Sequence, residues 1–428
     1  MSTDNSADQE LHQCCGGPSA GLLPVAEGQR QILQQVQPLS CWEQVDVRQA
    51  LGRILAADVI SPINVPAYNN SAMDGYAVRG TELPATGEAR LKVVGNVLAG
   101  HPYSGPLAAG ECVKIMTGAQ VPEGLDTVII KEVCHCDDGP DGHFVGFPSG
   151  ALIGQNRRMA GEDLAQGSVA VAAGIRLGAA ELGLIASLGQ AEVKVRRKPR
   201  VAYFSTGDEI NSLGEPLQAG QIYDSNRYTV TALLQQMGIE VLDLGVIRDK
   251  PEAIEEAFLL ASSQADMVIS SGGVSLGEAD FVKDTLDKLG QVSFWRMAIK
   301  PGRPLAFGHV QDALFFGLPG NPVAVMITFL QFVKPALRKL AGESQLLASA
   351  FQVRCAQRLK KKPGRTEYIR AICSTNSDGE LLVVTTGQQG SGILTSMSRA
   401  NCLIVLEQER GTVETGDSVW VQPFDGLL

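Results

Sequence analysis

The sequence predicts a multidomain α/β protein with a doubly wound parallel-sheet domain, an inserted β domain, a small helical domain and a C-terminal β barrel or sandwich. Three observations support this fold class. Residues 198–343 alternate apolar runs with amphipathic helical patterns, as in a parallel sheet covered on both faces. Residues 66–163 and 344–428 instead carry short β-like runs separated by Gly and Pro. The chain has 428 residues, which is too many for one ordinary core.

The doubly wound domain is predicted over residues 198–343. Its expected strands are continuous apolar runs at 201–204, 241–244 and 267–270. Its expected helices cover 225–237, 251–263 and 280–289. A further helix begins at Pro322, because proline is favoured at the first helical position. Gly238 and Gly290 follow two of these helical patterns, where a C-cap glycine belongs.

A discontinuous helical domain is predicted from residues 23–65 and 164–197. We expect its helices at 25–36, after Asp46, and at 179–188, and we expect the first and the last to pack together. The β segment 66–163 would then be inserted into this domain.

The two ends of the chain differ in character. Residues 1–22 are rich in Ser, Gly, Gln and Asp and are expected to form a disordered tail. Residues 344–428 contain the strand patterns of the last β domain, at 352–355, 368–373, 381–384, 403–406 and 418–421.

Composition excludes several classes of protein. The net charge of −10 argues against a general nucleic-acid binder, whose phosphate contacts need a basic face. No apolar run approaches the ~18 residues that would span a membrane. The first residues lack the apolar core of a secretory signal, and the nine cysteines are scattered, so we expect a cytoplasmic protein with free thiols. Cys134-His135-Cys136 is interpreted as strand or hairpin sequence, since no second pair of metal ligands is found.

Polar stretches follow three expected strands, at 205–209, 246–249 and 270–280. Ligands of open parallel sheets lie beyond the carboxyl ends of strands. The third stretch begins Ser270-Ser271-Gly272-Gly273 and includes Ser275, and its backbone amides and hydroxyls suit a phosphate-like anion. It has neither the GxxxxGK[ST] pattern of a P-loop nor GxGxxG. A plain tight turn remains the alternative.

Asp249 and Asp280 end the second and third stretches and could share a hard cation. Mg²⁺ commonly binds one or two carboxylates together with ligand phosphates, which would suit pyrophosphate chemistry. The alternative is that both residues cap helices.

Two stiff turns carry further candidates. Lys300 and Arg303 are interleaved with prolines, which fix the backbone around two cations. Pro319 and Pro322 frame a turn that leads into a helix N-terminus, where the macrodipole favours anions. We expect these turns to converge with the strand ends on one cleft.

The β segment has a polar island of its own, formed by Asp74 with the stretches around Thr117 and Asp163. Taken alone, an Asp among small residues is typical of an Asx turn and would be structural.

Together these residues resemble the molybdopterin molybdotransferases, the MoeA and gephyrin E-domain family. The similarity covers about residues 25–425 in order, with motifs at 70–77, 115–119, 161–163, 204–209, 270–280, 300–304, 318–322 and 385–391.

The resemblance implies four domains, a homodimer, and a cleft shared between the doubly wound domain of one subunit and the inserted β domain of its partner. The implied substrates are adenylylated molybdopterin and molybdate, the products are molybdenum cofactor and AMP, and the implied metal is Mg²⁺. Other enzymes of molybdenum cofactor biosynthesis are implied partners.

The resemblance also implies roles for individual residues. The Ser/Gly loop would hold pterin or nucleotide phosphate, and Asp249 and Asp280 would position Mg²⁺. The molybdate oxyanion would be bound by Lys300, Arg365 and Ser391. The remaining implied site residues are Asp74, Asp163, Glu209, Thr117, Arg303, Pro319 and Pro322.

The chain departs from the family pattern at a few positions. Arg296 and Arg303 stand where lysine is common, and both keep the charge. Ala324 replaces a frequent serine near the oxyanion, and Gly392 replaces a frequent histidine after Ser391.

Two alternative functions compete with this interpretation. A molybdopterin adenylyltransferase shares the doubly wound domain and its Ser-Gly-Gly loop, but it consumes ATP and normally lacks both β domains. A gephyrin-like scaffold would use the same architecture to bind receptor peptides, although nothing here resembles gephyrin's linker or partner domain.

Overall fold

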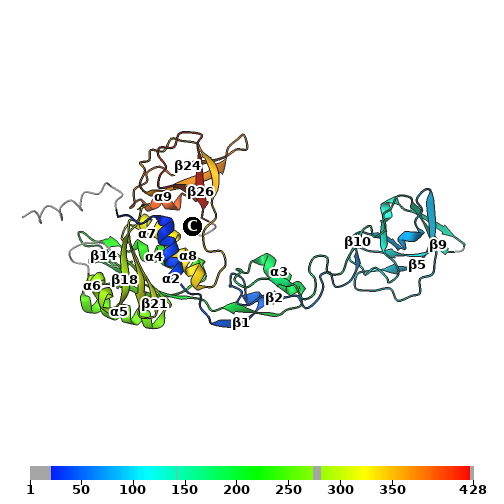
Figure 1. Cartoon of the computed structure of the whole chain (residues 1–428), viewed down its shortest axis with the longest axis horizontal. Helices are drawn as coiled ribbons and strands as arrows, with labels where there is room; N and C mark the ends of the chain where they lie inside the picture. Colours follow the sequence, from blue (N-terminus) through cyan, green and yellow to red (C-terminus); the bar gives the residue numbers. More distant parts are fainter. Residues whose placement is uncertain (1–20, 141, 273–280, 425–428) are drawn as a thin grey trace, which may run out of the picture.

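The computed structural model describes residues 21–140, 142–272 and 281–424. It has four parts: the α/β domain (β13 to α8, together with α2), the barrel (β22 to β26), the central module (β1, β2, β11, β12 and α3) and the β arm (β3 to β10). Figure 1 shows the α/β domain and the barrel at one end, the central module in the middle, and the β arm at the other end.

The α/β domain is built on a mixed six-stranded sheet. Its strand order is β16(Glu240–Ile247), β13(Arg200–Thr206), β17(Met267–Ser271), β21(Ala313–Leu318), β20(Pro304–Val310) and β18(Gly290–Arg296). The first four strands are mutually parallel, whereas β20 and β18 run antiparallel to their neighbours. The parallel part confirms the predicted fold class, but the antiparallel edge was not predicted. A two-stranded ribbon, β14(Ile210–Asn211) with β15(Ile222–Tyr223), lies outside this sheet.

Helices cover both faces of the sheet, as a doubly wound fold requires. One face packs against α4(Ser225–Gln236), α7(Pro322–Thr328), the π-helical turn η5(Phe329–Val333) and α8(Lys334–Leu340). The other face packs against α5(Pro251–Gln264) and α6(Phe281–Leu289). Alternate residues of β13 serve the two cores, with Tyr203 in the first and Phe204 in the second.

The first helix belongs to the α/β domain. In α2(Val25–Gln35), Val25 and Ile32 are buried in the same core as α7 and α8, and the backbone at Leu23 pairs with Met297. The predicted packing of this helix against residues 179–188 is therefore wrong.

The central module contains more strand than helix. Its strands pair as β1(Trp42–Asp46) with β12(Glu192–Arg196) and β2(Val59–Ile60) with β11(Val169–Val171). Among its described residues, α3(Ala179–Ser187) is the α-helix, and the helix predicted after Asp46 is only the 3₁₀ turn η2(Val47–Gln49). The Asp46 carboxylate accepts from the Arg48 amide at 2.9 Å, so Asp46 does cap this turn.

The β arm is a six-stranded sheet with a short extra pair. The sheet order is β7(Thr127–Ile130), β4(Gly75–Val78), β6(Glu111–Ile115), β5(Glu88–Val97), β9(Gly142–Pro148) and β8(His135–Gly139). The extra pair is β3(Asn70–Ser71) with β10(Arg157–Arg158), and short 3₁₀ turns lie at η3(Gly80–Glu82) and η4(Lys131–Val133). These strands confirm the short β-like runs predicted for residues 66–163. Cys136 lies in β8, and its thiol is 3.1 Å from the Tyr76 hydroxyl.

The C-terminal β domain is a closed five-stranded barrel. Its order is β23(Thr366–Thr375), β24(Leu381–Thr385), β22(Phe351–Cys355), β26(Ser418–Pro423) and β25(Cys402–Leu406), and β25 pairs back to β23. The short strand β19(Ile299–Lys300) of the α/β domain adds to β23 in parallel. The helix α9(Leu394–Ser398) contacts α7. These contacts hold the barrel against the α/β domain and position the candidate site. Across the described residues, no helix is both long and apolar enough to cross a membrane.

Candidate active site

A cavity of about 680 Å³ lies between the α/β domain and the barrel. Loops from both parts form its walls, and they bring together seven of the residues predicted from the sequence. These are Glu209, Gly272, Lys300, Arg303, Pro319, Arg365 and Ser391. Pro301, Gly302, Pro304, Gly320, Asn321, Ala324, Gln389 and Gly390 complete the lining. The predicted convergence of the two stiff turns on one cleft is therefore seen in the structure.

The cationic wall of the cavity carries unpaired positive charge. Lys300 forms an ion pair with Glu367, at 3.1 Å between Nζ and Oε2. Neither Arg303 nor Arg365 has a carboxylate partner within ion-pair distance in the described part of the chain. The two guanidinium groups therefore give the cavity a net attraction for an oxyanion.

The Lys300–Pro304 turn is tightly packed against α7. Gly302 has a φ of +98°, and a Cβ atom at this position would lie 2.5 Å from the Thr328 hydroxyl oxygen. Glycine is required on both counts, because other residues rarely adopt this backbone conformation and none would fit. Ala324 lines the same cavity and brings no hydroxyl.

The turn before α7 is held by contacts from other elements. Pro322 takes the first turn of α7, as predicted, and lies just behind the cavity-lining residues. The Val323 amide donates to the Ser391 carbonyl at 3.0 Å, and the Asn226 side-chain amide donates to the Gly320 carbonyl at 2.7 Å. The barrel thus accepts a hydrogen bond from one of the backbone amides at this helix N-terminus, so fewer free amides remain to bind an anion than the sequence predicts.

The strand ends behind the cavity are buried and polar. Ser271 Oγ lies 2.6 Å from the Tyr203 hydroxyl, so this serine is already engaged. Ser270 Oγ and Thr206 Oγ1 are both buried without a hydrogen-bond partner among the described residues. Gly272 has a φ of +91°, and a Cβ there would collide with the Thr206 carbonyl. Gly273, Ser275 and Asp280 lie outside the described residues.

Three carboxylates, those of Asp208, Glu209 and Asp249, lie beside the cavity at the ends of β13 and β16. Asp249 is exposed, but partial loss of its hydration raises its pKa, and the neighbouring Asp208 and Glu209 carboxylates raise it further. Both of these carboxylates repel that of Asp249, and a hard cation bound beside it would relieve this repulsion. Within the described residues alone, no three metal-binding side chains are grouped, and the proposed second ligand, Asp280, lies outside them.

The polar island of the β arm is well ordered internally. The Thr117 amide and hydroxyl donate to Asp74 Oδ1 at 2.9 and 2.8 Å, and Lys131 Nζ lies 3.3 Å from Oδ2. These contacts, the Thr117 amide first, lower the pKa of Asp74 to about 2. Asp163 is exposed in the turn after β10. Because the β arm lies at the opposite end of the molecule from the α/β domain (Figure 1), one chain does not bring Asp74 and Thr117 to the cavity. Asp163 lies in the connection after the β arm, where its amide donates to the Val65 carbonyl, and it does not line the cavity.

Sequence reasoning missed several polar residues around the cavity. Gln389 and Asn321 line it directly, and Asn226 supports its floor. Asn321 and Gln389 lie in the motifs at 318–322 and 385–391, and their polar side chains were the signal that could have identified them as site residues. Asn226 carried no such signal, because polar residues are ordinary in the first turn of a helix.

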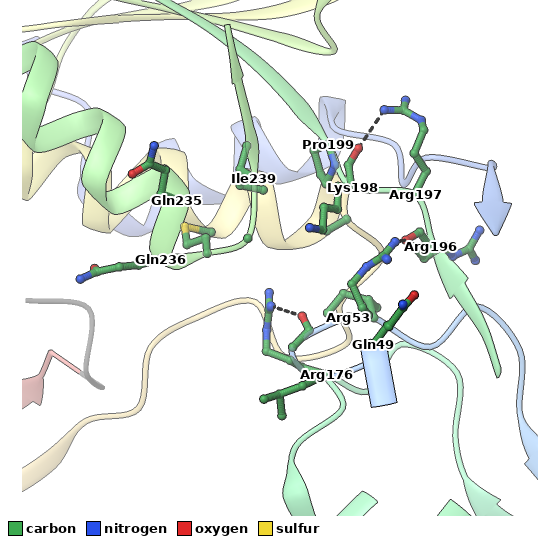
Figure 2. Close-up of a pocket in the computed structure, with 16 residues that line it drawn as sticks. Gln49, Arg53, Arg176, Arg196, Arg197, Lys198, Pro199, Gln235, Gln236 and Ile239 are labelled. Carbon is green, nitrogen blue, oxygen red and sulfur yellow. Dashed lines mark hydrogen bonds between the residues drawn. The ribbon is translucent and has the colours of Figure 1, made fainter. Parts of the chain in front are cut away.

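A second cavity, of about 270 Å³, lies where the central module joins the α/β domain (Figure 2). It is lined by five cations: Arg53, Arg176, Arg196, Arg197 and Lys198. Arg176 pairs with Glu343 at 3.0 Å, and Arg197 pairs with Asp266 at 2.8 Å. Arg53 pairs with Glu43 and also donates to the Arg196 carbonyl at 2.8 Å. Most of this charge is used to hold the joint, which is why the first cavity is the better candidate site.

Fold and cavity together define a multidomain protein of the α/β class with a cationic cavity between two of its parts, and comparisons with known proteins specify its family. Three family models match in succession: "MoeA N-terminal region (domain I and II)" over residues 23–189, "Probable molybdopterin binding domain" over 202–339, and "MoeA C-terminal region (domain IV)" over 352–424.

Whole-length relatives agree with the family models. A molybdopterin molybdenumtransferase of Haemophilus influenzae is 45% identical over 95% of this chain and 100% of the relative. One from Nostoc is 37% identical over 89% of this chain and 88% of the relative. A crystal structure of the molybdopterin biosynthesis moeA protein from Pyrococcus horikoshii superimposes with a TM-score of 0.80, at 26% identity over 94% of this chain and all of that one. The chain therefore belongs to the MoeA family.

Proposed function

We propose that this protein inserts molybdate into adenylylated molybdopterin, releasing AMP and giving molybdenum cofactor. The relatives that support this activity are molybdopterin molybdenumtransferases matched over nearly their whole length. The observation in the structure that carries the proposal is a pair of guanidinium groups, Arg303 and Arg365, that have no carboxylate partner among the described residues and lie in a cavity that also holds Ser391.

The cavity offers molybdate two kinds of contact. Arg303 and Arg365 would attract the dianion, and the Ser391 hydroxyl and the Gln389 amide would donate hydrogen bonds to its oxygens. Lys300 would contribute less than the sequence suggested, because Glu367 already neutralises it. Ala324 removes a hydroxyl that many relatives would supply, so the arginines carry more of the binding here.

The phosphate end of the substrate would lie at the ends of β13 and β17. Gly272 gives close backbone approach, and Ser270 Oγ and Thr206 Oγ1 are buried groups that lack partners among the described residues. Asp249 fits a cation, since partial loss of its hydration and two nearby carboxylates raise its pKa. Mg²⁺ held by Asp249 and Asp280 would neutralise charge on the pyrophosphate and on the departing AMP.

We propose that the active unit is a homodimer whose clefts are shared between subunits. Asp74 and Thr117 form a preorganised carboxylate–hydroxyl pair, yet they lie far from the cavity of their own chain. In a two-fold dimer each β arm could cover the cavity of the partner, which would give both groups a role.

We further propose that the protein works in the cytoplasm. All seven cysteines in the described part of the chain are free, as expected of a reducing compartment.

The test is molybdate-dependent release of AMP from purified adenylylated molybdopterin by the full chain. AMP release that requires both molybdate and Mg²⁺ is the expected result. Conversion of free molybdopterin with consumption of ATP would instead identify an adenylyltransferase. Absence of both reactions, with intact folding, would leave the scaffold function, and peptide capture would then be examined.

A further inference from the structure

Arg370 is a buried cation that the proposed chemistry does not use. It lies in the middle of β23 and is 1% exposed. No carboxylate stands within ion-pair distance of it in the described part of the chain, although sixteen other pairs of this kind are found there. Burial lowers the pKa of Arg370 to about 10, so the guanidinium remains charged at neutral pH. Burying an unpaired charge is costly, and the contacts of this side chain show where that cost is offset.

The guanidinium holds the loop that carries Ser391. Arg370 Nη2 donates to the Gly390 carbonyl at 3.0 Å. Its Nε donates to Ser396 Oγ at 2.9 Å, and that hydroxyl in turn donates to the Ile393 carbonyl at 2.6 Å. The planar fork therefore fixes two points of the loop, one on each side of Ser391.

The backbone of Arg370 holds the start of the same loop. Its amide donates to Gln389 Oε1 at 2.9 Å, and Gln389 Nε2 donates back to the Arg370 carbonyl at 3.1 Å. The Thr386 amide donates to the same carbonyl at 3.0 Å. Gln389, which lines the cavity, is thus oriented by the backbone of β23 at position 370, and substitution of the Arg370 side chain leaves these bonds in place.

Ser391 is held on both of its sides. The carbonyl of the preceding residue, Gly390, accepts from Arg370, and its own carbonyl accepts from the Val323 amide at 3.0 Å. Both peptides that flank Ser391 are thus fixed, and its hydroxyl forms no hydrogen bond with the described residues. Preorganised donors of this kind cost no ordering free energy when an anion arrives.

We propose that Arg370 is a positioning residue for the molybdate end of the active site: its guanidinium fixes the loop around Ser391 and places a positive charge against Gly390, which lines the cavity. This inference rests on the proposed function. Because Arg370 is buried, solvent and salt screen its charge less than they screen the charges of Arg303 and Arg365. Molybdate binding, rather than binding of the pterin substrate, is the step that depends on it.

The experiment compares Arg370→Met and Arg370→Lys with the wild type in AMP release, varying molybdate and adenylylated molybdopterin in turn. Arg354→Met is the matched control, because Arg354 is an exposed arginine of the same barrel paired with Glu380. Far-UV circular dichroism and gel filtration establish that each variant is folded.

We expect Arg370→Met to raise the KM for molybdate at least about tenfold, as loss of hydrogen bonds from a charged group predicts, with the KM for adenylylated molybdopterin within about twofold. Arg370→Lys should raise the molybdate KM by about threefold, because the charge returns without the fork. An equal rise in both KM values, or an unchanged molybdate KM in a folded variant, would overturn the inference. If Arg370→Met does not fold, Arg370→Lys decides on the same criteria.

A binding measurement separates this inference from the proposed function. Equilibrium dialysis of molybdate against the wild type and the Arg370 variants needs no turnover. If the wild type releases no AMP, the proposed function fails, and the inference survives only if molybdate binding weakens in the variants. If the wild type is active and molybdate binds the variants as tightly, the inference alone fails.

Discussion

The Val323 amide, in the first turn of α7, donates to the Ser391 carbonyl at 3.0 Å, and this bond crosses from the α/β domain to the barrel. It ties together two segments that border the candidate cavity, one from each part. The cavity therefore depends on the docking of the barrel, and the Ser391 hydroxyl is placed by backbone contacts that do not involve the hydroxyl itself.

Substitution of Ser391 by alanine should weaken molybdate binding without unfolding the protein. The hydroxyl is lost while the carbonyl bond to Val323 remains, so we expect the KM for molybdate to rise about tenfold, the effect of one hydrogen bond to an anion. The melting temperature should stay within about 2 °C. Ser398→Ala, on an exposed face of α9, is the control and should change neither quantity. Unchanged molybdate kinetics in Ser391→Ala would remove this residue from the site.

Gly302→Ala should destabilise the protein and disturb the cationic turn. The φ of +98° and the close approach to Thr328 Oγ1 together predict a loss of about 2–3 kcal/mol in the free energy of unfolding. Urea denaturation measures this directly. Gly379→Ala is a matched control, because Gly379 has a φ of +81° but a Cβ atom there would meet no described atom within 4 Å.

A second variant isolates the steric part of the Gly302 effect. Adding Thr328→Ala to Gly302→Ala removes the hydroxyl that the new methyl group would meet, so part of the lost stability should return. Thr328→Ala alone loses the bond to the Ala324 carbonyl and a buried methyl group, and should cost about 1–2 kcal/mol. Strict additivity of the two substitutions would show that the contact is not the cause.

Asp249→Asn should make the metal-free protein more stable while abolishing activity. The pKa of Asp249 is raised in the folded protein, so the folded state binds the proton more tightly than the unfolded state. Stability is therefore greatest below the unfolded-state pKa and decreases as the pH rises through the folded-state pKa. Asparagine does not ionise, so the variant does not lose stability in this way as the pH rises. The melting temperature of Asp249→Asn should therefore exceed that of the wild type at a pH of about 7 but not at about 3.

Mg²⁺ should make the wild type melt at a higher temperature than Asp249→Asn, which reverses the order expected without the metal. With the cation bound, the wild-type carboxylate is stabilised, so Mg²⁺ should raise the melting temperature of the wild type more than that of Asp249→Asn. AMP release should fall at least about a hundredfold in the variant, and EDTA should inhibit the wild type to a similar level. Asp312→Asn, in the exposed turn between β20 and β21, serves as control. Full activity of Asp249→Asn would exclude it as a metal ligand.

Mixing two inactive chains tests the shared cleft. Asp74→Ala and Asp249→Ala should each be inactive as homodimers, but a heterodimer has one cleft with neither substitution. We expect exchanged mixtures to recover about a quarter of wild-type activity, since about half of the dimers are mixed and each has one intact cleft. Mixing Asp74→Ala with a chain that carries both substitutions should recover nothing. No recovery in the first mixture, with subunit exchange verified, would contradict a cleft shared between subunits.

Local sequence signals predicted three of the four parallel strands of the central sheet, β13, β16 and β17, and much of the candidate site. Continuous apolar runs followed by polar, glycine-containing stretches identify buried parallel strands and their ligand-facing ends within a few residues of sequence. The prolines around Lys300 and Arg303 and the turn at Pro319 and Pro322 were recognisable for the same reason, because each fixes the backbone locally.

Contacts between distant segments decided the rest. The antiparallel edge of β18 and β20, the closure of the barrel by β25 on β23, and the docking of α2 on the α/β domain depend on partners that no local pattern specifies. The same holds for Arg370, whose place in an alternating strand is ordinary but whose side chain organises the loop around Ser391. The sequence by itself determines the local elements, because the periodicity of apolar residues and the restraint of prolines and glycines act over a few residues. Which buried surfaces meet, and therefore which charges stay unpaired beside a cavity, is settled only when the whole chain competes for its contacts.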